Sequence, residues 1–302
     1  MRETAGVTET ALSPPPSPGG KGRRHEGVLL VLGAALLWST GGLGIKALSE
    51  LPLKVAFYRS AFAAATLFLM LRPRVRRWSP AFLAALATYA ACLVSFVVAT
   101  KWTTAANAIF LQYAGVVWVL LLSPIVVGEP LRLRDAGAVA VALAGMALFF
   151  VGRFGPGGRG DWMALASSFF FAGLVLSLKR EGEGGAEAAV TLGNVVAVVA
   201  LLPFVAGDLS LSPRSAVILA ALGVFQLACA YVLFVRGLKH VTATQAALIG
   251  MAEPVANPVW VFLFVGERPS SYALLGGVIV LGAIAWRTLA AAPVVEPVPP
   301  PD

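Results

Sequence analysis

The sequence predicts an all-α polytopic membrane protein with ten transmembrane helices arranged as two inverted five-helix repeats, and three observations lead to this fold class. The 302-residue chain is 58% hydrophobic and 13% charged, with a mean hydropathy of +0.83, which is more apolar than a water-soluble domain can hide. Apolar windows of about 20 residues, long enough to cross a ~30 Å hydrocarbon core, recur with short breaks. The sequence also aligns with itself at a spacing of 138 residues.

The spans are taken in order along the chain. Residues 1–27 are rich in Pro, Ser, Gly and charge, which predicts a disordered cytoplasmic tail, and residues 292–302 form a Pro-rich extended tail. The first apolar run is read as an uncleaved span because no small-residue cleavage site follows it. We predict spans at about 28–46, 54–71, 81–100, 104–122 and 135–152 in a first repeat (28–152), and at about 161–178, 189–206, 215–235, 242–264 and 272–291 in a second (153–291).

The basic residues indicate how these spans are oriented. An even number of spans puts both termini on one side of the membrane. Fifteen of the 23 Lys and Arg residues fall on that side and seven on the other, while Arg59 lies inside a span. By the positive-inside rule, both termini are expected to be cytoplasmic.

Charge and motif content exclude several functional classes. The net charge of +8 is scattered over short connections instead of gathering on one face, so no nucleic-acid partner is expected. Cys92 and Cys229 lie in apolar segments without paired Cys or His, so neither a metal site nor a cofactor is expected. The sequence holds no phosphate loop, His-Glu-x-x-His or Gly-x-Ser-x-Gly motif, so we expect no catalytic residues and no enzyme.

The repeat covers the fourth and ninth spans. Residues 96–129 align without a gap with residues 234–267 and are identical at eleven of 34 positions. Apolar composition alone would not produce the matches Lys101/Lys239, Thr104/Thr242, Gly128/Gly266 and Glu129/Glu267. Because each unit has five helices, the second must cross the membrane in the opposite sense, an arrangement typical of secondary transporters.

Several of these motifs resemble the EamA family of the drug/metabolite transporter superfamily. The matching residues are Ala252-Glu253-Pro254, Gly266-Glu267-Arg268, Gly128-Glu129 and Phe57-Tyr58-Arg59. The resemblance covers about residues 28–291 and implies ten helices, a bacterial inner membrane and export of amino acids or related metabolites. The family commonly has a proline in both halves, whereas this chain has Gly115-Val116 where the second half has Glu253-Pro254. The first half is therefore expected to be less kinked.

Glu253 is the principal candidate for a functional group. A carboxyl at membrane depth costs about 2.5–3.5 kcal/mol on insertion scales, so it should face the protein interior. Pro254 should kink the helix and free nearby carbonyl groups. Two interpretations stay open: Glu253 exchanges protons or holds a solute amino group, or it bonds the backbone groups that Pro254 frees. Helical spacing places Thr242, Gln245, Ile249, Glu253, Asn257 and Trp260 on one stripe that could line a solute path.

Other candidates are ranked around this stripe. The candidate substrate-binding residues are Glu253, Asn257, Gln245, Asn107, Arg59, Trp38 and Trp260. Gln112, Tyr113, Gln226 and Tyr231 are weaker candidates, because a lone polar residue in a bundle is more often a helix-to-helix contact. Pro254, Gly128, Glu129, Gly266 and Glu267 are expected to be structural.

The sequence thus predicts a secondary transporter for a small-molecule solute in the lipid bilayer, with proton coupling and a homodimer left open. The alternative is a non-transporting membrane scaffold or sensor. That alternative predicts no solute-dependent flux and tolerance of substitution along the stripe.

Overall fold

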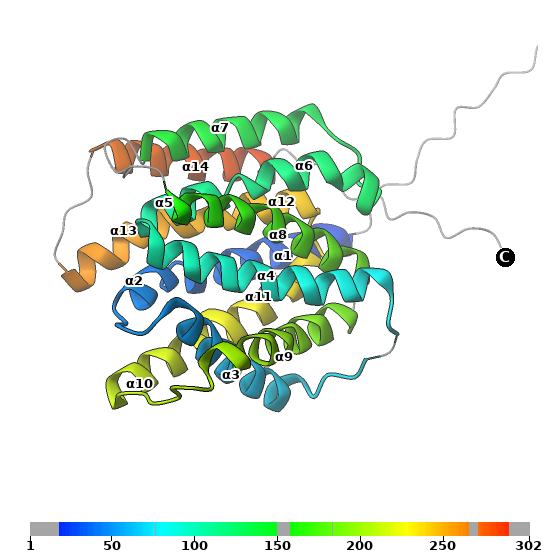
Figure 1. The fold of residues 1–302 in the computed structure, drawn as a ribbon. Helices are drawn as coiled ribbons and strands as arrows, with labels where there is room; N and C mark the ends of the chain where they lie inside the picture. Colours follow the sequence, from blue (N-terminus) through cyan, green and yellow to red (C-terminus); the bar gives the residue numbers. More distant parts are fainter. Residues whose placement is uncertain (1–17, 76, 150–157, 183, 266–270, 290–302) are drawn as a thin grey trace, which may run out of the picture.

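The computed structural model describes residues 18–75, 77–149, 158–182, 184–265 and 271–289, and within these ranges every regular element is helical (Figure 1). The elements are α1 (Pro18–Trp38), α2 (Gly41–Lys46), α3 (Pro52–Leu71), α4 (Pro80–Trp102), α5 (Ala105–Gln112), α6 (Gly115–Val126), α7 (Leu133–Phe149), α8 (Arg159–Glu181), α9 (Gly185–Val205), α10 (Pro213–Ala221), the π-helix η1 (Leu222–Cys229), α11 (Ala230–Leu238), α12 (Ala243–Gly250), α13 (Ala252–Val265) and α14 (Ser271–Leu289). In this part of the chain, eight helical segments are long and apolar enough to cross a membrane.

The helices form a bundle whose outside is apolar. Helices α7 and α14 pack together along one edge, α3, α9 and α10 form the opposite edge, and α1, α4, α8 and α11 lie between them (Figure 1). Asp135 and Arg287 form a buried ion pair between α7 and α14. Large apolar side chains point outward, such as Leu69 (81% exposed) and Ile125 (79% exposed). A soluble protein rarely carries so apolar a surface, so this surface faces lipid and the chain is a multi-pass membrane protein.

The start of α1 corrects one prediction. The helix begins at Pro18, so residues 18–27, expected in the disordered tail, are helical, while residues 1–17 lie outside the described part of the chain. Composition misleads here because the segment has tertiary partners. Gly27 lies so close to the end of α11 that an added Cβ would lie 3.0 Å from the Gly237 carbonyl oxygen and 2.6 Å from Cβ of His240, which follows that helix. Arg24 Nη2 donates to the Thr288 carbonyl at 2.5 Å.

The fourth and ninth predicted spans are both interrupted. The second-half helix breaks at Met251, next to Pro254, and the first-half helix breaks at Tyr113 and Ala114 without any proline. The first half is therefore interrupted as well, although it lacks the Glu-Pro pair of the second half. Backbone bonds from Ala114 N to Leu111 O (3.2 Å) and from Val116 N to Tyr113 O (3.1 Å) tighten that turn, and at Gly115 a Cβ would lie 2.6 Å from the Ser168 carbonyl oxygen of α8.

Candidate functional site

A small cavity lies where the two interrupted helices meet inside the bundle. It measures about 40 Å³, room for a few water molecules. Its lining comes from both halves of the chain and consists of Trp38, Arg59, Cys92, Leu93, Phe96, Gln112, Tyr113, Phe171, Gln226, Leu227, Tyr231 and Glu253. A few polar side chains therefore point into one cavity within an otherwise apolar bundle. Small-molecule sites in proteins usually have this arrangement.

Tyr113 joins the two helix breaks. Its hydroxyl oxygen lies 2.6 Å from the carbonyl oxygen of Gly250, the last residue of α12, and 2.7 Å from Oε2 of Glu253 in the first turn of α13. An interrupted helix leaves backbone groups that need partners, and a hydroxyl from the other broken helix supplies one. Both Tyr113 and Glu253 are buried, with 3% and 7% of their surfaces exposed.

Arg59 enters the cavity from α3. It is 1% exposed, and its Nη2 donates to Oε1 of Gln226 at 2.6 Å. Gln226 lies in the π-helix η1, where Gly223 lets η1 approach the backbone of α3, and its own Nε2 donates to the Trp38 carbonyl at 3.5 Å. The Nε and Nη1 atoms of Arg59 have no hydrogen-bond partner within the described part of the chain. One edge of the guanidinium is thus fixed while other donors remain free.

Aromatic rings and a polar cluster complete the walls. The ring of Tyr231 lies 5.1 Å from that of Trp38 and 4.8 Å from that of Tyr89, measured between centroids. On another wall, Gln112 Nε2 donates to Ser167 Oγ at 2.8 Å. Asn194 of α9 donates to the Tyr89 hydroxyl at 2.8 Å and does not line the cavity.

Of the seven predicted substrate-binding residues, the structure brings Glu253, Arg59 and Trp38 together around the cavity, and the remaining four lie outside its lining. Asn107 donates to Thr103 and Asp161 at 3.2 and 3.3 Å, near one end of the bundle. Gln245 follows Thr242, whose side chain accepts the Gln245 backbone N–H at 3.1 Å as the N-cap of α12.

The other two lie along α13. Trp260 Nε1 donates to Ser39 Oγ at 2.6 Å, and the Asn257 amide lies beside Gly42. Gln112, Tyr113, Gln226 and Tyr231, ranked lower from the sequence, do line the cavity. The break at Met251 explains the difference, because the stripe that a continuous helix would form is divided between α12 and α13.

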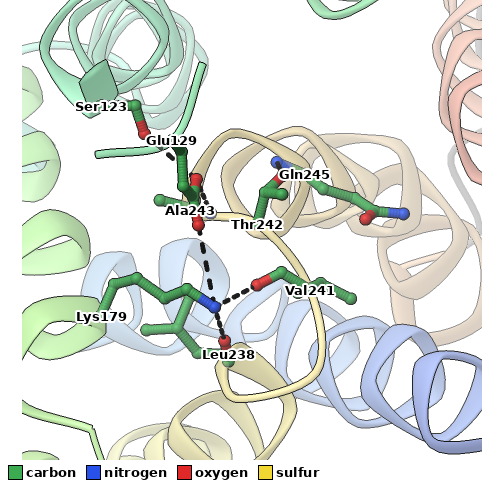
Figure 2. A network of polar contacts seen from close by, with 8 residues as sticks. All are labelled: Ser123, Glu129, Lys179, Leu238, Val241, Thr242, Ala243 and Gln245. Carbon is green, nitrogen blue, oxygen red and sulfur yellow. Dashed lines mark hydrogen bonds and ion pairs between the residues drawn. The ribbon is translucent and has the colours of Figure 1, made fainter. Parts of the chain in front are cut away.

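The Gly128-Glu129 motif forms a polar network at one end of the bundle (Figure 2). Gly128 has a φ of +71°, which favours glycine, and turns the chain so that Glu129 Oε2 accepts the Ala243 N–H at 2.8 Å. Lys179 of α8 lies 3.8 Å from Glu129 Oε1 and donates to the carbonyls of Leu238 (2.8 Å) and Val241 (2.6 Å).

Burial raises the pKa of the Glu129 carboxyl, and the nearby Lys179 opposes this shift. The equivalent residues Gly266 and Glu267 lie outside the described residues.

Polar contacts, two of them between the two halves of the chain, also link the helices at the opposite end. Lys46 Nζ donates to the Thr103 carbonyl at 2.8 Å, and the Thr103 hydroxyl donates to Asp161 at 2.7 Å. Lys54 and Asp208 form an ion pair at 2.8 Å. The cavity therefore lies between two ends that are each held together by polar contacts.

Comparisons with known proteins place the chain among membrane proteins of related sequence. A family model described as the EamA-like transporter family matches residues 25–151 and 158–289. An Archaeoglobus fulgidus protein described as an uncharacterized transporter is 26% identical over 284 residues, covering 86% of this chain and 96% of that protein. Bacillus subtilis YwfM, also described as an uncharacterized transporter, is 28% identical over 287 residues, covering 88% of this chain and 94% of that protein.

One solved crystal structure superposes with a TM-score of 0.76 at 19% identity. It covers 88% of this chain and 97% of the other. This likeness concerns the fold.

Proposed function

The chain belongs to the EamA-like transporter family and is a membrane transporter, and we propose that it exports amino acids or related small metabolites across a bacterial inner membrane in exchange for protons. The single observation that carries this proposal is the cavity in which Glu253 and Arg59 meet between two broken helices. Secondary transporters bind their solutes near the bilayer midplane between discontinuous helices. The outward direction and the amino-acid class rest on the family resemblance.

The proposal includes ten membrane crossings in two inverted units, residues 28–152 and 153–291. The match of one family model to two successive segments supports it. Helix pairing supports it too, because α4 packs on α8 and α1 on α11, while α7 pairs with α14 and α3 with α9. A two-fold axis that exchanges the two units would relate the α4–α8 pair to the α1–α11 pair. The same axis would map the α7–α14 pair onto itself, and likewise the α3–α9 pair. Relative rocking of such units would alternate access to the cavity.

Glu253 is proposed as the proton-exchanging group because of the hydrogen-bond count at Tyr113. The tyrosine hydroxyl has one proton, and the Gly250 carbonyl oxygen, 2.6 Å away, can only accept it. With that proton on the Gly250 carbonyl, a protonated Glu253 carboxyl would complete the 2.7 Å contact by donating to the hydroxyl oxygen, whereas an ionised one would compete with the carbonyl for the tyrosine proton. An opening that separates α5–α6 from α13 would break this contact and let the proton leave as the solute enters or departs.

The small cavity and the polar contacts at both ends fit a state of such a cycle in which the solute site is contracted. About 40 Å³ holds a few waters but no amino acid, so solute entry needs the helices to part. The Glu129–Lys179 network and the Lys46, Thr103 and Asp161 contacts are the links that would open in turn.

Flux in proteoliposomes tests the proposal. Vesicles holding wild-type protein and a labelled mixture of the standard amino acids should release label faster than protein-free vesicles, and a proton gradient should change that rate. Glu253→Gln should stay folded, and its release should not respond to the gradient. Glu187→Gln serves as the control, because Glu187 pairs with the half-exposed Arg236 far from the cavity lining.

Two results decide between the alternatives. Wild-type flux and pH profile in Glu253→Gln would show that the carboxyl only supports the break at Pro254. Absence of flux for every solute in the mixture would favour the scaffold or sensor.

A further inference from the structure

Arg59 is a buried cation that forms no ion pair with a carboxylate among the described residues. The ion pairs among the described residues involve Lys54, Lys179, Arg236 and Arg287, and none involves Arg59. A guanidinium stays protonated in proteins, and an unpaired charge at membrane depth is costly. An anionic group that enters the cavity would therefore stabilise it by completing an ion pair.

The free donors of Arg59 are held ready for such a group. Gln226 fixes Nη2 at 2.6 Å, so the guanidinium is oriented before any ligand arrives. Nε and Nη1 have no partner, and the side chain lines the cavity. Donors that are buried, oriented and unpaired form a site for an acceptor that carries negative charge.

The acidic group nearby does not fill this role. Glu253 lies on the cavity but contacts Tyr113 at 2.7 Å, and it makes no ion pair with Arg59 within 4.0 Å. Tyr89 and Tyr231, the other titratable groups close to Arg59, are neutral hydroxyls. If Glu253 is protonated as proposed above, the cavity has a net positive charge.

Resting on the proposed function of this cavity, we propose that Arg59 binds a carboxylate of the solute and selects small monocarboxylates with an apolar body. Among the described residues that line the cavity, Arg59 is the one base, and a single base matches one negative charge better than a phosphate dianion. Trp38, Leu93, Phe96 and Leu227 provide apolar surface for the rest of the solute.

Three matched sets of ligands test the proposal on the wild-type protein. The sets are alanine, propionate and ethylamine; leucine, 4-methylpentanoate and 3-methylbutylamine; and phenylalanine, 3-phenylpropionate and 2-phenylethylamine. Binding to protein in nanodiscs is measured by titration calorimetry and thermal shift. In at least one set the two carboxylates should bind roughly tenfold or more tightly than the amine, the discrimination expected from a charge-assisted hydrogen bond.

Variants connect this preference to Arg59. Arg59→Gln should abolish the difference between carboxylates and amine, and Arg59→Lys should keep part of it because the charge remains while the fork of donors is lost. Arg236→Gln, a change at a half-exposed arginine, should leave the preference intact. If Arg59→Gln does not fold, the comparison of carboxylates with amines on the wild-type protein still tests the proposal.

The proposal is overturned if the amine binds as tightly as the carboxylates in every set, or if no carboxylate binds in any set. Its failure is distinguishable from failure of the proposed function. A protein that transports amines in proteoliposomes remains a transporter, but one whose arginine does not select the solute.

Discussion

Glu129 accepts the backbone N–H of Ala243 at 2.8 Å, so a carboxyl in the turn that follows α6 caps the first turn of α12, 114 residues further along the chain. The first N–H groups of a helix lack partners within the helix, and a negative charge there also favours the helix dipole. This contact explains why a Gly-Glu pair directly follows α6.

Glu129→Gln should lower the thermal stability of the protein and leave solute affinity unchanged. The amide oxygen can still accept from Ala243, but the ion pair with Lys179 is lost, and we expect a loss of about 1 kcal/mol in the free energy of unfolding. Thermal unfolding in detergent, compared with Glu187→Gln, measures the effect. Normal stability with abolished binding would instead place Glu129 in the solute path.

The Lys54–Asp208 ion pair predicts a pH dependence of stability at low pH. Hydrogen bonds from Lys54 and Ser210 lower the pKa of the Asp208 carboxyl to about 2, from an ordinary value of 3.8. Because the folded-state pKa is the lower one, the contribution is present above about pH 4 and is lost as the pH falls towards 2. The melting temperatures of wild type and Asp208→Asn should therefore differ at pH 6 and converge near pH 2. A difference that stays constant over this range would contradict the assignment.

The sequence predicts the class of fold and the kinds of side chain in the cavity better than it predicts which residues line the cavity. Glu253 and Arg59 stand out because charges inside spans are rare, and Trp38 was a candidate too; all three line the cavity. Gln226 is ranked too low from the sequence, since it lies in a π-helix, where the spacing of side chains differs from 3.6 residues per turn.

The helix breaks limit sequence reasoning in a second way. Pro254 signals the break at Met251, but nothing comparable marks the break at Tyr113, where the close approach of Gly115 to α8 is a tertiary contact. The direction of each polar side chain after a break depends on that geometry. The repeat match of Thr104 with Thr242 reflects a structural role, because the two residues are the N-caps of α5 and α12.

The orientation in the membrane is predicted by the distribution of basic residues. Reporters fused after Arg77 and after Arg287 should both lie in the cytoplasm, because 15 of the 23 basic residues fall on that side. Paired fusions of alkaline phosphatase and a fluorescent protein at each point give opposite signals and serve as mutual controls. A periplasmic signal at either point would contradict cytoplasmic termini.

Gly223→Ala should separate η1 from α3 and disturb the Arg59–Gln226 contact. An added Cβ would lie 2.5 Å from Phe62 Cβ and 2.8 Å from the Arg59 carbonyl oxygen, and the second of these is backbone that cannot turn aside. We expect a loss of about 1–3 kcal/mol in the free energy of unfolding, the usual range for overpacking, together with weaker binding of carboxylate ligands.

The matched change is Gly282→Ala in α14, where a Cβ meets nothing within 4 Å. Removing that helical glycine should stabilise the protein by about 0.5–1 kcal/mol and leave binding unchanged. Thermal unfolding and calorimetry on both variants measure the two effects separately. Because Arg59 is held through Gln226 on η1, wild-type binding in a folded Gly223→Ala protein would show that the close approach of η1 to α3 does not position the guanidinium.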